Sequence, residues 1–269
     1  MTTDAAIPSD DSTQSTDSRA IRIAVMLLVV GLHAVRPFVS QGVNTVLVGS
    51  TLLITLYSAL RGWKNAVHLG LLYAIIGISW LFPVVLDVLW SPYPPALAVY
   101  LLVVLLIKPL RQSVDWLRPG YLTQNVIWWI IAVIAVSTAG LVTWYLFSRP
   151  DVDAIVRLLP RSNVVMIVAA VLGFAIVNAV VEEFIFDGVC YHAFETVIAI
   201  PLVVILLQAV SYGMAHYTGI PRGWLGVAMA VAYGGLMLGY LRYRTGGILY
   251  PIIAHICADI TIGLLVFFA

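Results

Sequence analysis

Nine apolar segments follow one another along the chain, separated by short polar connections. They cover residues 21–36, 43–60, 67–90, 94–107, 124–147, 163–195, 198–217, 223–241 and 247–268. A helix needs about 20 apolar residues to cross a bilayer, and most of these segments approach or exceed that length. The pattern predicts an all-α integral membrane protein with eight or nine transmembrane helices. The last four helices are expected to form a C-terminal core.

The polar segments divide the chain into three parts. Residues 1–19 are rich in serine, threonine and aspartate and contain no aromatic residue, which is typical of a disordered tail. We expect residues 20–150 to hold the N-terminal transmembrane helices. Residues 160–269 are expected to hold the core, which carries most of the polar residues discussed below.

Composition supports the membrane assignment and narrows the partners. The 269-residue chain is 62% hydrophobic and 10% charged, whereas soluble domains are about 25% charged. The net charge of +1 argues against a nucleic-acid partner. The expected location is therefore a lipid bilayer, with the cytoplasmic membrane of a prokaryote as the specific prediction.

A few acidic and histidine residues interrupt the apolar segments of the C-terminal half. Glu182 and Glu183 are two of only three glutamates in the chain, and they end an almost wholly apolar run that begins at Val164. A carboxylate near the middle of a membrane helix costs about 2.5–3.5 kcal/mol on insertion scales, so two in succession indicate a function. Later polar positions are His216, His255 and Asp259. We hypothesise that these residues form one buried polar site.

The rise of an α-helix places these residues at similar depths. Glu182 lies 14 residues before Thr196, which is about 21 Å along one helix, and His216 lies about 22 Å beyond Pro201 on the next. His255 and Asp259 lie about 12 and 18 Å beyond the start of the last helix. Their i,i+4 spacing puts both on one helix face. The residues can therefore share one layer if these helices pack together.

The residue types in this layer suit hydrolysis, although each also has a structural interpretation. A glutamate paired with a histidine can deprotonate water and later protonate a leaving amine. A second histidine with a nearby carboxylate can bind a metal or polarise a carbonyl. Alternatively, single histidines and Asp259 could hydrogen-bond between packed helices, and buried carboxylates could relay protons in a transporter.

Three short motifs in this region resemble the CPBP family of CAAX-protease and bacteriocin-processing intramembrane proteases, also called Abi. The family pattern Glu-Glu-x-x-x-Arg is matched by Glu182 to Asp187, and Phe-x-x-x-His by Tyr212 to His216. The pattern His-x-x-x-Asn/Asp is matched by His255 to Asp259. The resemblance covers roughly residues 160–269. The family includes the type II CAAX prenyl endopeptidases.

The resemblance implies an intramembrane endopeptidase that cleaves membrane-embedded or lipid-anchored peptides or proteins. Glu182 would activate the attacking water with His216, while His255 and Asp259 would stabilise the oxyanion or help to bind a metal. A zinc ion held by Glu182, His216 and His255 and a metal-free glutamate mechanism both remain open.

Two positions depart from the family pattern. Tyr212 replaces phenylalanine, and Asp187 replaces the arginine that would neutralise Glu183. Glu183 and Asp187 are instead like charges at i,i+4, so one should be protonated or a cation should lie between them. Candidate cations are Arg161, Arg222 and Arg242. This departure motivates an alternative in which the protein is a catalytically silent relative that binds membrane partners.

Overall fold

The computed structural model describes residues 11–82, 91–150 and 164–267, with side chains described from Ser18 to Val266 within these ranges. All regular secondary structure in this part of the chain is helical, which confirms the predicted all-α fold. The N-terminal elements are α1 (Asp11–Ala34), η1 (Arg36–Phe38), α2 (Gln41–Leu60), α3 (Lys64–Ser79), α5 (Tyr93–Leu106), α6 (Lys108–Arg111) and α7 (Gln124–Ser148). The C-terminal elements are α9 (Val164–Glu183), η2 (Phe184–Cys190), α10 (Tyr191–Glu195), α11 (Pro201–Ala215), α12 (Gly223–Ala230), η3 (Val231–Leu238), α13 (Gly239–Thr245) and α14 (Leu249–Phe267).

Six helices in the described ranges are long and apolar enough to cross a membrane. They begin with Ser18–Phe38 and Gln41–Leu60 in the N-terminal half, and three of them run through the C-terminal half. Three further apolar helices, α3, α5 and α11, are shorter, with 16, 14 and 15 residues. Six of the eight or nine predicted spans are therefore full-length helices, and the other apolar segments form shorter ones.

The first helix begins earlier than the sequence predicts. Helix α1 starts at Asp11, inside the polar segment 1–19 that is expected to be disordered. A formed helix extends at little cost because each added residue gains one backbone hydrogen bond. Near this end, Arg19 Nε donates a hydrogen bond of 2.6 Å to the carbonyl oxygen of Val197, next to the α10–α11 connection.

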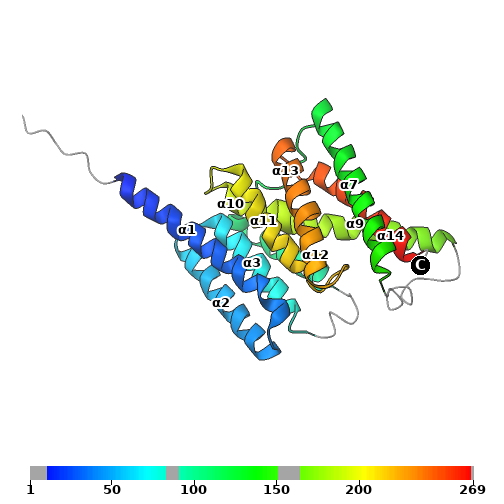
Figure 1. The fold of residues 1–269 in the computed structure, drawn as a ribbon. Coiled ribbons are helices and arrows are strands. Elements are labelled where there is room, and N and C mark those ends of the chain that lie inside the picture. Colours follow the sequence, from blue (N-terminus) through cyan, green and yellow to red (C-terminus); the bar gives the residue numbers. More distant parts are fainter. Residues whose placement is uncertain (1–10, 83–90, 151–163, 268–269) are drawn as a thin grey trace, which may run out of the picture.

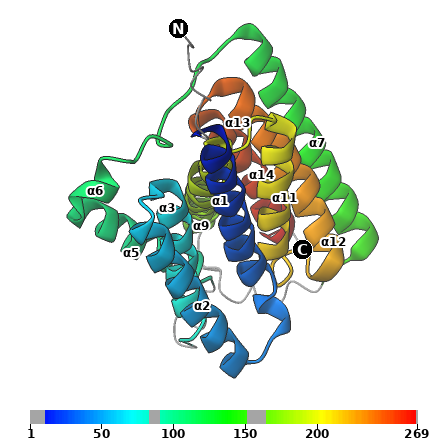
Figure 2. The ribbon, with the colours of Figure 1, turned by 90° about the vertical axis from the view of Figure 1, so that its left-hand side faces the viewer.

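Helix α1 lies between two groups of helices. It packs against α2 and α3 on one side and against α11 on the other (Figures 1 and 2). On the far side of α11 lie α12 and then α7, and α14 packs between α7 and α9. A single apolar core crosses this boundary, because Met26 and Leu69 cluster with Ile185 and Phe194. The N-terminal helices therefore support the C-terminal core directly.

Two π-helical segments border the predicted site. Segment η2 continues α9 after Glu183, and η3 continues α12 after Ala230. Glycines let η3 approach α11 closely: a Cβ atom on Gly234 would lie 1.9 Å from the Tyr212 ring, and one on Gly235 would lie 2.3 Å from Ala209 Cβ. π-Helical turns inside α-helices are often found at functional sites. Here they bring Tyr212 and the end of α9 into one layer.

Candidate active site

The structure brings the four residues predicted to be catalytic into one buried cluster. Glu182 is the penultimate residue of α9, His216 immediately follows α11, and His255 and Asp259 lie on α14. Glu183 and Tyr212 join them, as shown by the contacts below. The side chains of Glu183, His255 and Asp259 are only 2–4% exposed. The shared depth inferred from helix rise therefore matches the packing of α9, α11 and α14.

Glu182 lies at the centre of this cluster. Its Oε2 accepts a hydrogen bond of 2.7 Å from the Tyr212 hydroxyl group. The same oxygen lies 3.5 Å from His216 Nε2 and 3.7 Å from His255 Nε2. The tyrosine ring stacks on the His216 ring at a centroid distance of 4.5 Å, which fixes the imidazole beside the carboxylate. Tyr212 is thus a direct partner of Glu182, in addition to filling the family's phenylalanine position.

The two histidines are oriented by their Nδ1 atoms. His216 Nδ1 lies 2.9 Å from the Tyr212 carbonyl oxygen, so it must donate there and leave Nε2 directed at Glu182. His255 Nδ1 lies 2.7 Å from Glu183 Oε1. A hydrogen bond at one ring nitrogen sets the role of the other, because the tautomer is then fixed. Glu183 is therefore the orienting partner of His255.

Asp259 is held from a second helix. Its Oδ1 lies 3.6 Å from His255 Nε2, and its Oδ2 accepts a hydrogen bond of 3.1 Å from Asn178 Nδ2 on α9. Asn178 was not among the predicted site residues. The sequence does carry a signal for it, because Asn178 precedes Glu182 by four residues and lies on the same helix face within an apolar run.

Three atoms that can accept protons face one another in this cluster. His216 Nε2 lies 3.5 Å from Glu182 Oε2, and His255 Nε2 lies 3.7 Å from the same oxygen. Such distances exceed those of strong direct hydrogen bonds and suit groups that share a bridging water. His216 is the most exposed member, with 21% of its side chain accessible. The cluster therefore opens towards the end of α11.

The same donor atoms do not form a recognisable metal site. Within the described ranges, no group of three or more histidine, cysteine, aspartate or glutamate side chains is arranged to hold a metal ion. Glu182 Oε2, the central atom of the predicted zinc site, is also used by the Tyr212 hydroxyl. The predicted zinc set of Glu182, His216 and His255 is therefore not supported among the described residues.

Asp187 lies on η2, four residues after Glu183. It is fully buried, and neither of its carboxyl oxygens has a hydrogen-bond partner in the described structure. Among the arginines proposed to replace the family's arginine, Arg242 reaches this segment: its Nε donates a hydrogen bond of 3.1 Å to the Asp187 carbonyl oxygen. Arg161 lies outside the described residues. Arg242 thus contacts the backbone of Asp187, while Glu183 is paired with His255.

Tyr233 on η3 is another site residue without a sequence signal. Its hydroxyl group donates a hydrogen bond of 3.1 Å to the Ala254 carbonyl oxygen, and its ring lies 6.1 Å from the His255 ring. It therefore braces α14 beside His255. Nothing in the apolar run around Tyr233 distinguishes it from an ordinary packing residue.

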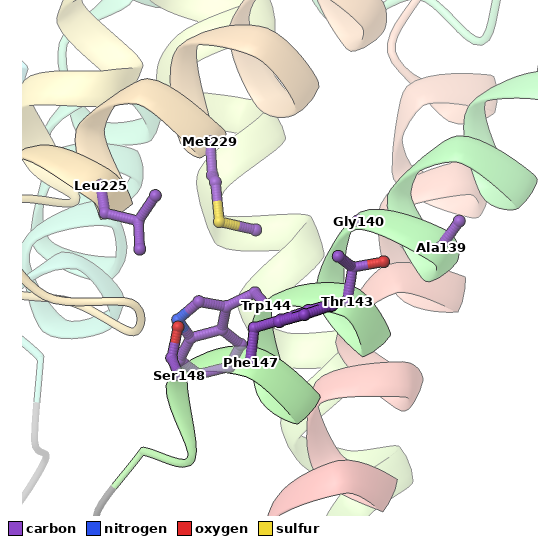
Figure 3. A pocket seen from close by; sticks show the side chains of 8 residues that line it. All are labelled: Ala139, Gly140, Thr143, Trp144, Phe147, Ser148, Leu225 and Met229. Carbon is purple, nitrogen blue, oxygen red and sulfur yellow. The ribbon is translucent and has the colours of Figure 1, made fainter.

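A surface groove of about 510 Å³ lies elsewhere, between α7 and α12. Its apolar lining includes Trp144 and Phe147 on α7 and Leu225 and Met229 on α12, which face one another across the gap (Figure 3). No predicted site residue lines it. The groove is therefore separate from the polar cluster.

Comparison with known proteins agrees with the motifs. Residues 164–261 match the model of the family described as type II CAAX prenyl endopeptidase Rce1-like. The match includes Glu182, His216, His255 and Asp259. No curated protein and no solved structure matches the chain. The resemblance predicted from the three motifs is thus confirmed, and residues 164–261 form a domain of the Rce1-like, CPBP family of proteases within an all-α membrane protein.

Proposed function

We propose that the protein is an intramembrane endopeptidase that hydrolyses peptide bonds of membrane-embedded or lipid-anchored substrates. The observation that carries this proposal is the convergence of Glu182, His216 and His255 on one small space from α9, α11 and α14. A carboxylate with two oriented imidazoles, buried among apolar helices, has the groups needed to activate one water molecule. Membership of a protease family supports the same reaction class.

Water activation is assigned to Glu182. A water held between Glu182 Oε2 and His216 Nε2 would lose a proton as its oxygen attacks the carbonyl carbon of the substrate. The Tyr212 hydroxyl group, donating to the same carboxylate oxygen at 2.7 Å, directs this oxygen towards the water. The proton then passes to the amine nitrogen as the carbon–nitrogen bond breaks. Glu182 and His216 are thereby returned to their starting states.

Stabilisation of the oxyanion is assigned to His255. Glu183 Oε1 lies 2.7 Å from His255 Nδ1 and favours the charged form of the His255 ring. The Nε2–H group of this imidazolium can then donate a hydrogen bond to the developing negative charge. Asp259, held by Asn178, adds further negative charge near Nε2. Preorganised donors in a water-poor site stabilise charge more strongly than they would in water. Glu183 and Asp259 act here through His255.

The test is proteolysis by the full chain reconstituted in liposomes. Lipidated and transmembrane test peptides are added, and products are followed by mass spectrometry. Glu182→Gln and His216→Gln are each expected to lower the cleavage rate about 10²- to 10⁴-fold, the usual size of a general acid–base contribution. Glu195→Gln is the matched control, because it removes a carboxylate outside the cluster.

The alternatives give different results in the same system. Cleavage that persists unchanged in Glu182→Gln would contradict the assignment of the water-activating group. Absence of cleavage, together with normal cellular function of both variants, would favour a silent relative that binds membrane partners. Proton flux across the liposome membrane that depends on Glu182 would favour a transporter.

A further inference from the structure

A buried arginine, Arg36, lies near the catalytic cluster, and no carboxylate among the described residues forms an ion pair with it. Arg36, at the end of the first membrane span, is only 6% exposed. Its Nη2 donates a long hydrogen bond of 3.5 Å to the Tyr73 carbonyl oxygen, whereas Nε and Nη1 have no partner in the described structure. A guanidinium group stays charged in proteins, and an uncompensated charge in the membrane is costly. Such a residue indicates a site for an anion.

The surroundings of Arg36 are shaped to keep the guanidinium group in place. Gly77 on α3 provides the space: a Cβ atom there would lie 1.8 Å from Arg36 Nη1. His33, 4% exposed, lies one helical turn away, and its Nδ1 also lacks a partner among the described residues. The His33 ring packs on Tyr73 at 4.5 Å and lies 6.4 Å from the Tyr93 ring. Two nitrogens of Arg36 and one nitrogen of His33 are therefore unpartnered among the described residues, one helical turn apart.

This group of residues borders the proposed active site. The Tyr93 ring lies 6.4 Å from the ring of His33, which is three residues before Arg36. The Tyr93 ring also lies 6.3 Å from Phe186, which in turn lies 5.0 Å from the Tyr212 ring. On the outer side, Phe38 packs on Tyr217 at 4.5 Å, and Tyr217 directly follows His216. The end of α1 and the following η1 are therefore joined to the catalytic layer by two routes, one through Tyr93 and Phe186 and one from Phe38 to Tyr217.

We propose that Arg36, assisted by His33 and Tyr93, binds a carboxylate group of the peptide substrate and positions the peptide for attack at Glu182. The unpartnered donors lie in the interior between α1 and α3 and next to Tyr93. Tyr93 links these donors through Phe186 to Tyr212 beside Glu182, so a peptide bound at Glu182 is the occupant that these aromatic contacts favour. The peptide identity rests on the proposed function, but carboxylate binding can be tested without any hydrolysis.

The experiment measures binding of apolar tripeptides to the detergent-solubilised full chain carrying His216→Ala, so that no bond is cut. One peptide has a free carboxyl terminus, a second has a carboxamide terminus, and a third has the carboxamide and a glutamate side chain. A charge-assisted hydrogen bond predicts about 10-fold or tighter binding of the free acid than of the amide. Preference for the third peptide instead would assign the site to a side-chain carboxylate, still in support of the proposal.

Substitutions test whether the carboxylate preference depends on Arg36 or on the overall positive charge of the protein. Arg36→Gln should remove the preference for the carboxylate, and Arg36→Lys should retain part of it because the charge remains. Arg61→Gln is the matched control, since Arg61 is exposed at the end of α2 and should leave the preference unchanged. Equal affinities for acid and amide in the His216→Ala protein with Arg36 intact would overturn the proposal, and this comparison needs no substitution at Arg36.

One further result would also overturn it. This result is loss of the preference in nanodiscs containing phosphatidylglycerol but not in nanodiscs of phosphatidylcholine alone, which would assign the site to a lipid headgroup. Failure of the proposed function gives a different result. The carboxylate preference would still depend on Arg36, but cleavage would be unaffected by Glu182→Gln. That result would support the carboxylate site and contradict only the proposed hydrolysis.

Discussion

Two histidine–carboxylate clusters lie along the same stretch of chain and differ in charge balance and exposure. In the proposed active site, the ion-pair partners of Glu182, Glu183 and Asp259 among the described residues are all histidines. In the second cluster, His192 lies between Asp115 Oδ1 at 2.5 Å and Glu195 Oε1 at 2.6 Å. Arg242 Nη2 lies 3.5 Å from the same Glu195 oxygen.

The difference explains why only one cluster is suited to chemistry. The Asp115 and Glu195 side chains are 55% and 35% exposed, so water and Arg242 already satisfy them. Glu182 and Glu183 are 10% and 2% exposed and depend on two imidazoles and one hydroxyl group. A satisfied, hydrated ion pair holds elements together, whereas a buried group with limited partners retains proton affinity for a reaction. The second cluster therefore serves to attach the α6–α7 connection to α10.

The largest expected contrast is between Glu183→Ala and Glu195→Ala. The first removes the partner of buried His255 Nδ1 and is expected to cost about 3–5 kcal/mol of unfolding free energy, the usual result of breaking a buried pair. The second breaks a partly exposed pair and is expected to cost at most about 1 kcal/mol. Denaturant unfolding in detergent measures both. Equal losses would show that the two clusters do not differ as described, and Glu183→Gln, which can still accept from His255, should lie between them.

The second contrast concerns Asp187 and Arg242, which connect the clusters. Asp187→Arg installs the family's arginine, but it would place a second buried cation beside Arg242, so we expect a loss of a few kcal/mol in stability. Adding Arg242→Gln should relieve part of this loss, giving a favourable coupling in a double-mutant cycle. Additive effects of the two substitutions would contradict the contact between η2 and α13.

The smallest expected effect is on Tyr212. Tyr212→Phe restores the residue type of the family pattern and keeps the ring packed on His216 and Phe186. It removes the hydrogen bond to Glu182 Oε2, and hydrogen bonds to charged groups contribute about 1.5–3 kcal/mol, so activity should fall about 10- to 100-fold. The melting temperature should change little. An unchanged cleavage rate would show that the hydroxyl group does not direct Glu182.

The sequence predicts the elements of the active site better than their pairing. Helix rise places Glu182, His216 and Asp259 at similar depths, although the stretch from Glu182 to Thr196 includes the π-helical segment η2. Sequence spacing does not specify that Glu183 partners His255, because η2 departs from α-helical geometry directly after Glu183. The expected like-charge contact between Glu183 and Asp187 likewise rests on an i,i+4 rule for regular α-helices. Asp187 lies in η2, which is π-helical, so the rule does not apply there.

Residues contributed by the N-terminal half are harder to predict. Arg36 belongs to the first span, and none of the sequence motifs includes it. Its position near Tyr93 and the catalytic layer depends on α1 packing against both α3 and α11. No local pattern specifies such long-range packing, since any of the apolar helices could have occupied that position. The short motifs indicate which residues form the centre of the site, whereas the tertiary contacts determine which other residues surround it.

Helix α11 has 15 residues, from Pro201 to Ala215, and His216 follows at its end. At 1.5 Å per residue it spans about 22 Å, which is less than the roughly 30 Å hydrocarbon thickness of a bilayer. Hydrophobic mismatch of this size is relieved by local thinning of the bilayer around a short segment. The lipid surface should therefore dip towards His216, and bulk solvent can supply the hydrolytic water from that side without a separate channel.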